Sequence, residues 1–155
     1  MNRHDNWQSR LTEVVSADQY GEFTWGENDC TQRAFDAIKA VIDVDYSEPY
    51  RGKYKTAKGA LRMLRRVDKV ETPAELMAKW FGPAQPIAFA RKGDIVTCDP
   101  SAVGFELQAD TDAFGRPIGI CYGYRSYFTG PHGRVEIETL LCAECFHVLK
   151  VEASE

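Results

Sequence analysis

The apolar pattern of the sequence changes at Pro83, and this change limits the folds that the chain can adopt. Before Pro83 the apolar residues recur at helical spacing. After it, short segments rich in β-branched and aromatic residues alternate with Gly, Pro and Asp, which is typical of strands and turns. Helices followed by an antiparallel meander predict an α+β fold, in which the helices cover one face of the sheet.

Four helical segments are expected before Pro83. They cover residues 7–20, 30–42, 56–67 and 72–81. Asp29 is the expected N-cap of the second segment. Thr72 is the expected cap of the fourth, with Pro73 in its first helical position and Gly82 at its end.

Five segments after Pro83 are expected to supply the strands. They cover residues 86–99, 103–110, 115–130, 134–140 and 145–151. The sequence contains no repeat and no long Ser- or Gly-rich linker. A chain of 155 residues is long enough for one domain with its own core, so we expect a single domain over residues 1–155.

Charge and hydropathy exclude several classes of partner. The formal net charge is -4, which gives no basic field for nucleic acid. No apolar run reaches the length of a membrane span, and residues 1–15 lack the apolar centre of a signal peptide. We expect a protein made in the bacterial cytoplasm. The 5 cysteines form an odd number without a signal peptide, so reduced thiols are expected rather than a disulfide framework.

Cys30 follows Asn28-Asp29 at the predicted start of a helix. The free N–H groups and positive dipole of a helix N-terminus make a thiol easier to ionise, and the thiolate is the nucleophilic form. The same N–H groups can stabilise an oxyanion. Alternatively, Cys30 is a small apolar residue that begins the buried stripe of the helix.

The segment WGENDC, from Trp25 to Cys30, is followed much later by KGDIV and PIGICYG. Their order and spacing resemble the NlpC-type cell-wall peptidases, and the resemblance covers residues from about 23 to 151. In that family Asp-Cys opens a central helix, a Gly-Asp-hydrophobic strand follows, and a later strand begins His-Val-Gly-Ile. The chain is more similar still to a branch of small proteins from phage and prophage tail gene clusters. The resemblance implies a papain-like fold, with N-terminal helices packed on a C-terminal antiparallel sheet.

The resemblance also implies a reaction. In the family a Cys attacks the peptide bond of a peptidoglycan stem peptide, a His on the facing strand takes the thiol proton, and a third polar group orients the His. Cys30 would be the nucleophile, Asp29 its helix cap, and the Cys30 backbone N–H part of the oxyanion hole. However, the motif His falls on Pro117, which cannot transfer a proton.

Two functions therefore remain open. The first is a phage tail-tip or hub protein that has lost catalysis, with other tail proteins as partners and the virion tail as its location. The second is an active thiol endopeptidase that cleaves peptidoglycan stem peptides during phage entry. A thiol hydrolase or amidase with another substrate is a third, lesser alternative.

Three histidines could replace the missing base. His147, in a late strand segment, is the candidate that we pair with Cys30, although a packed strand His is an alternative. His4 is expected to be exposed, and His132 is expected in a turn between strands. Asp94 and Asp99 could orient a catalytic His; otherwise Asp94 stabilises a turn and Asp99 caps a strand end.

Cys142 and Cys145 form a Cys-x-x-Cys pair, which can be half of a zinc or iron–sulfur site. His147, Cys121 or Cys98 could complete such a site only if the fold brings them together, so we expect no metal and no cofactor. Another segment, YSEPYRGKYK, either lines a groove beside Cys30 or packs its rings on the sheet edge. Its aromatic residues are Tyr46, Tyr50 and Tyr54.

Overall fold

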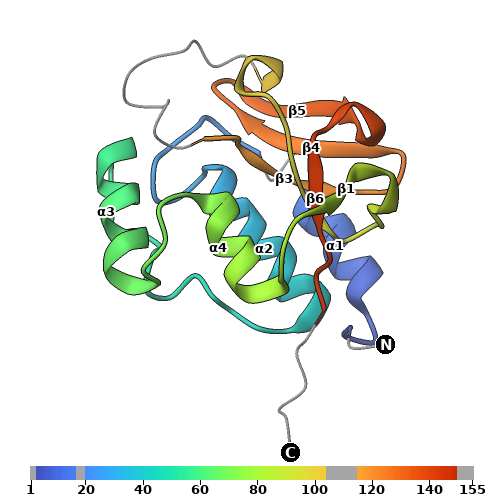
Figure 1. Cartoon of the computed structure of the whole chain (residues 1–155), viewed down its shortest axis with the longest axis horizontal. Helices are drawn as coiled ribbons and strands as arrows, with labels where there is room; N and C mark the ends of the chain where they lie inside the picture. Colours follow the sequence, from blue (N-terminus) through green and yellow to red (C-terminus); the bar gives the residue numbers. More distant parts are fainter. Residues whose placement is uncertain (1–2, 17–19, 104–114, 150–155) are drawn as a thin grey trace, which may run out of the picture.

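The computed structural model describes residues 3–16, 20–103 and 115–149 (Figure 1). It confirms the α+β class, with helices first and an antiparallel sheet second. The helices are α1 (Trp7–Val15), α2 (Cys30–Ile42), α3 (Ala57–Val67) and α4 (Pro73–Phe81). The strands are β1 (Gln85–Pro86), β2 (Ile95–Thr97), β3 (Ile118–Cys121), β4 (Arg125–Gly130), β5 (Gly133–Glu138) and β6 (Glu144–Phe146). Short 3-10 helices are η2 (Ile87–Phe89), η3 (Pro100–Val103) and η4 (Thr139–Leu141).

Local capping explains where the helices begin and end. Asp29 accepts a hydrogen bond from the backbone N–H of Gln32, as an N-cap residue does. Thr72 accepts from Glu75 in the same way at the start of α4, and Gly82 ends that helix with a φ of 89°. The predicted caps are therefore confirmed. Helix α1 is shorter than the predicted segment and ends at Val15.

The sheet is a meander only in part. Strands β2 to β5 are neighbours in chain order, as predicted. Strand β6 then returns to the other side of the sheet and lies between β1 and β2, antiparallel to both. This return pairs the last strand with the whole of β2.

The strands are shorter than the predicted segments, and segment 115–130 contains two of them, β3 and β4. In 86–99 only Pro86 and Ile95–Thr97 are in strands. In 145–151 the strand ends at Phe146, because the backbone N–H of Val148 donates to the Asp94 side chain instead of to a neighbouring strand. The predicted strand over 103–110 lies outside the described residues, except for Val103 in η3.

The sheet separates two apolar clusters. The larger cluster joins residues of all four helices to the sheet face that they cover, and the central helix α2 packs on β3 (Figure 1). Its fully buried members include Leu11, Phe35, Ile38, Leu76, Ile95 and Ile120. The smaller cluster lies on the opposite face and contains four of the five cysteines: Cys98, Cys121, Cys142 and Cys145. In the part of the chain that the structure describes, no helix has both the length and the apolarity that crossing a bilayer requires.

Candidate functional site

Asp29 anchors the start of helix α2 and is almost fully buried, with 2% of its surface exposed. One carboxylate oxygen accepts from the backbone N–H of Gln32 at 2.8 Å. The other accepts from the N–H of Gly26 at 2.8 Å and from the hydroxyl of Tyr54 at 2.7 Å. Three donors thus hold the residue that precedes Cys30 in one orientation.

The WGEN turn can adopt this arrangement because residue 26 is a glycine. Gly26 has a φ of 83°, a conformation that side chains disfavour. A Cβ atom there would lie 2.3 Å from the carbonyl oxygen of Tyr54. The backbone of the aromatic segment therefore runs directly against the turn, and the N–H of Gly52 donates to the carbonyl of Gly26 at 2.9 Å.

Cys30 is the first residue of α2, as predicted, and its side chain is half-buried. Its Sγ donates to the backbone carbonyl of Thr129 in β4, at 3.4 Å. Burial, followed by the negative charge of Asp29, raises the pKa of the Cys30 thiol to about 12. This direction is opposite to the one that a helix N-terminus alone would produce.

The strand register places Cys30 and His147 at opposite ends of β2. Thr97, the last residue of β2, pairs with Ile118 of β3. When the β3–β4 register is extended by two residues, Thr129 of β4 lies beside Ile118. Cys30 bonds to Thr129 and therefore lies near the Thr97 end of β2. Asp94 precedes β2 at its other end and contacts His147. Three residues of strand, about 10 Å, separate the two ends, and no described contact joins Cys30 to His147.

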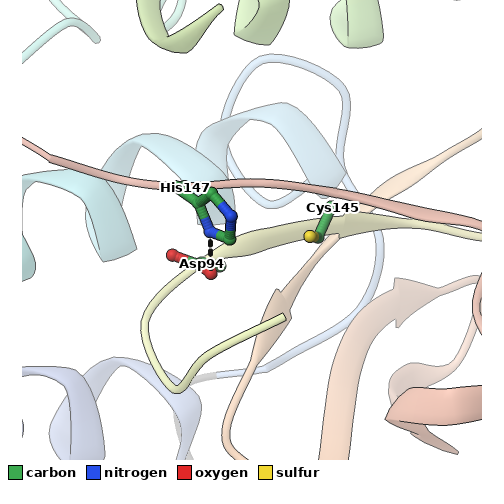
Figure 2. A group of neighbouring side chains, drawn as sticks. All are labelled: Asp94, Cys145 and His147. Atoms are coloured by element: carbon green, nitrogen blue, oxygen red, sulfur yellow. Dashed lines mark hydrogen bonds and ion pairs between the residues drawn. The ribbon is translucent and has the colours of Figure 1, made fainter. Parts of the chain in front are cut away.

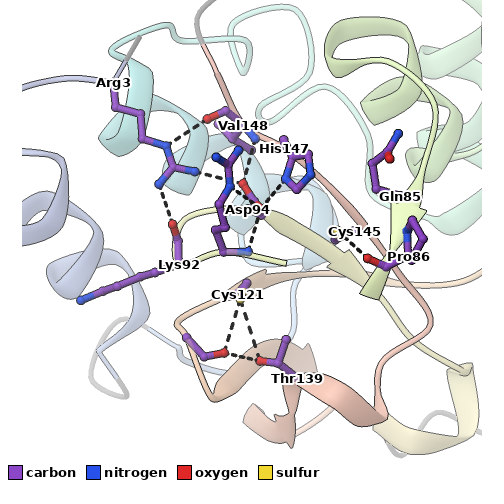
Figure 3. A network of polar contacts seen from close by, with 12 residues as sticks. Arg3, Gln85, Pro86, Lys92, Asp94, Cys121, Thr139, Cys145, His147 and Val148 are labelled. Atoms are coloured by element: carbon purple, nitrogen blue, oxygen red, sulfur yellow. Dashed lines mark hydrogen bonds and ion pairs between the residues drawn. The ribbon is translucent and has the colours of Figure 1, made fainter. Parts of the chain in front are cut away.

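His147 is instead held by Asp94. Its Nδ1 lies 2.7 Å from Asp94 Oδ2, and 27% of its side chain is exposed (Figure 2). Asp94 is fully buried and also accepts from the guanidinium of Arg3 at 3.0 Å and from the backbone N–H groups of Arg91 and Val148 (Figure 3). The bond from Arg91 stabilises the predicted turn, while Arg3 was not identified from the sequence because it lies 91 residues from Asp94.

The remaining candidate residues from the sequence are His4, His132 and Asp99. His4 was expected to be exposed but is half-buried, because its backbone N–H donates to Val41 near the far end of α2. His132 is exposed in the turn between β4 and β5, as predicted, three residues after Thr129. Asp99 accepts from the backbone and hydroxyl of Ser101. It therefore caps the turn that begins η3 and does not approach a histidine in any described contact.

The aromatic segment packs rather than lines a groove. Tyr50 and Tyr54 are buried, and Tyr46 stacks on Trp80 with ring centroids 4.0 Å apart. Tyr54 nevertheless contributes to the site through its bond to Asp29. This contact could not be found from spacing alone, since 25 residues separate the two side chains.

Three buried hydroxyls near Cys30 were missed by the sequence analysis. Among the described residues, the side-chain oxygens of Tyr20, Thr97 and Thr129 are buried without a hydrogen-bond partner. The register puts Thr97 and Thr129 on the sheet face that carries Ile95 and α2, at the end nearest Cys30. Cys30 also contributes to raising the pKa of Tyr20, although burial is the main cause. Polar groups therefore gather around this thiol, yet none of them is a base at neutral pH.

Of the Cys-x-x-Cys pair, only Cys145 belongs to the group of possible metal ligands found among the described residues. Cys142 Sγ donates to the carbonyl of Glu138 at 3.8 Å, and Cys145 Sγ donates to that of Pro86 at 3.5 Å. Cys145 lies with Asp94 and His147 instead (Figure 2).

Comparison with known proteins gives one result. A family model described as a domain of unknown function, DUF6950, matches residues 2–148. The chain belongs to the DUF6950 family. No curated protein and no solved structure matches this DUF6950 chain significantly.

Proposed function

We propose that this DUF6950 protein is an NlpC-like module of a phage tail tip or hub that has lost peptidase activity. Three features in chain order support a papain-like ancestry. They are an Asp-Cys pair at the start of the central helix, a Gly-Asp pair before strand β2, and a strand β3 with the sequence IGIC. The antiparallel sheet behind the central helix also agrees with that ancestry.

The proposed loss of catalysis rests on the groups that surround the Cys30 sulfur. Its described hydrogen-bond partner is a backbone carbonyl, which accepts the thiol proton in a hydrogen bond but cannot remove it. Pro117 occupies the motif position of the base, and its carbonyl accepts from Cys98 N–H at 3.3 Å. His147 bonds to Asp94 at the other end of β2. A protonated thiol without a base is a poor nucleophile.

Digestion of purified peptidoglycan tests the catalytic part of this proposal. We expect wild-type protein to release no new peptide fragments, as judged by mass spectrometry of the soluble products. Cys30→Ala is the matched control. Fragments that appear with wild type and disappear with Cys30→Ala would show that Cys30 is an active nucleophile. Pro117→His restores the motif base, so any gain of activity in this variant should depend on Cys30.

Assembly into a tail tests the structural part. Mass spectrometry of purified particles should detect the protein together with tail-tip or hub proteins. Deletion of its gene should leave particles with altered or incomplete tails. Particles that lack the protein and are unaffected by its deletion would contradict a structural role, whatever the result of the digestion.

An active thiol endopeptidase is the second candidate, and one observation favours it. The hydroxyls of Tyr20, Thr97 and Thr129 are buried and unpartnered near Cys30, and they would hydrogen-bond a peptide only after the segments that cover them move. The exposed His132 follows Thr129 in the next turn and could supply a base if that turn moves. In this case His132→Ala should abolish cleavage while His147→Ala retains it. Cleavage that survives His132→Ala and is lost in His147→Ala would instead identify His147 as the base.

A further inference from the structure

We propose that Asp94, Cys145 and His147 form a binding site for a zinc ion, separate from Cys30. One candidate ligand atom from each residue lies within 4.8 Å of the other two (Figure 2). A carboxylate oxygen, a thiolate and an imidazole nitrogen are the ligand types that zinc binds in proteins. Three protein ligands with an open fourth position are also the usual composition of a zinc site that retains a water or takes a substrate.

The fold brings the three side chains together through the pairing of β2 with β6. Ile95 pairs with Phe146 and Val96 with Cys145. Continuing this register by one residue places Asp94 opposite His147, where their 2.7 Å contact is found. Cys145 and His147 alternate with Phe146, so they project to the same face. The cluster therefore depends on backbone pairing and not on the flexibility of a loop.

Asp94 is held so that one oxygen remains directed at the cluster. Its Oδ1 accepts from Arg3 at 3.0 Å and from the N–H of Val148 at 3.1 Å (Figure 3). Its Oδ2 accepts from the N–H of Arg91 at 2.8 Å and faces His147 Nδ1. The ion would bind Oδ2 and Nδ1 in place of the 2.7 Å contact that now joins these two atoms.

Small movements complete the coordination. Ligand atoms of a tetrahedral zinc ion lie about 3–4 Å apart, which follows from bonds of about 2.0–2.3 Å. Nδ1 and Oδ2, which are 2.7 Å apart, must therefore separate slightly. His147 can adjust because it is partly exposed, and this exposure also provides a path from solvent.

The protons balance in a simple way. In the metal-free protein the Cys145 thiol carries a proton, because its Sγ donates to the carbonyl of Pro86 at 3.5 Å. Zinc binding forms the Zn–S bond and releases the thiol proton to solvent. A proton on His147 Nδ1 must likewise leave that nitrogen before it can bind the ion. No oxidant or reductant is needed.

Titration of the reduced, metal-free full-length chain with Co²⁺ tests the site, because cobalt replaces zinc and reports thiolate ligation by its absorption. We expect a thiolate-to-cobalt band and visible bands of tetrahedral intensity that saturate at about one ion per chain and are lost on addition of Zn²⁺. Cys145→Ser should abolish the thiolate band. His147→Gln should weaken affinity by at least about tenfold.

Cys142→Ser is the matched control, because it removes a buried thiol three positions away that is not part of the cluster. It should bind Co²⁺ like wild type. Circular dichroism of each metal-free variant separates lost binding from lost folding, and the partly exposed His147→Gln provides the test if Cys145→Ser does not fold. Absence of the band in wild type, its persistence in Cys145→Ser, or its loss in a folded Cys142→Ser would overturn the proposal.

Discussion

The thiol of Cys30 donates a hydrogen bond to the backbone carbonyl of Thr129, across 99 residues of sequence. This bond exists only while the sulfur keeps its proton. Burial also opposes a negative charge on the sulfur, and the neighbouring carboxylate of Asp29 opposes it further. Together they outweigh the lowering of the Cys30 pKa that a helix N-terminus alone would cause.

Cys30 should react slowly with alkylating reagents at neutral pH. Its pKa is raised from 9.0 to about 12, so the thiolate fraction should increase about tenfold per pH unit between pH 8 and pH 11. Mass spectrometry after timed iodoacetamide labelling measures this rate. The urea-unfolded chain is the control, since all of its cysteines should react at similar rates. Complete labelling of folded Cys30 within seconds at pH 7 would contradict the prediction.

The same shift makes the folded state less stable in alkali. Because the folded pKa is raised, the unfolded chain loses this proton first, and stability falls as the pH rises from about 9 toward 12. Urea unfolding at pH 8 and pH 10 should show a lower midpoint at pH 10. Cys30→Ser should reduce this difference. An equal loss of stability in wild type and Cys30→Ser would assign the effect to other groups.

Tyr54→Phe should destabilise the protein by about 1–3 kcal/mol. The hydroxyl donates to Asp29 at 2.7 Å and accepts from the Gln32 side chain at 3.1 Å, and all three groups are buried. Urea unfolding measures the change. Tyr124→Phe is the matched control, because that exposed hydroxyl bonds only to Glu138 among the described residues. It should change stability by less than about 0.5 kcal/mol, and similar losses in both variants would contradict the role given to Tyr54.

Arg3→Ala should cost far more stability than Arg10→Ala, although both arginines form ion pairs of 3.0 Å. Arg3 and Asp94 have only 5% and 0% of their side chains exposed, against 29% and 59% for Arg10 and Asp43. Breaking a buried pair costs about 3–5 kcal/mol, whereas a surface pair contributes about 0–1 kcal/mol. Thermal and urea unfolding compare the two variants. Equal effects would mean that Asp94 finds other partners when Arg3 is removed.

Gly119→Ala should destabilise the sheet by about 1–3 kcal/mol. An added Cβ would lie 2.5 Å from the ring of Phe128 and 2.7 Å from the carbonyl oxygen of Tyr127. Gly21→Ala is the control, because its added Cβ meets nothing closer than 3.8 Å. Urea unfolding should detect a loss in the first variant and little change in the second. A neutral Gly119→Ala would show that β3 and β4 can separate without cost.

The helices could be predicted from the sequence because their signals are local. Asp29 and Thr72 cap the helices that follow them, and both bonds join residues three positions apart. The periodic apolar stripe identified the buried face of α2, including Ala37 and Ile38 within the core. The change of pattern at Pro83 likewise predicted where strands replace helices.

Only the tertiary structure decided how the strands are ordered and what surrounds the candidate residues. Strand β6 pairs with β1 and β2, and this return brings His147 to Asp94 instead of to Cys30. Asp29, Asp94 and Cys30 each have a partner far away in the sequence, at separations of 25, 91 and 99 positions. Helix caps and periodicity depend on neighbours in sequence, so the chain alone specifies them. Strand pairing and desolvation depend on distant segments, so the ionisation of Cys30 and the Asp94 cluster follow only from the complete fold.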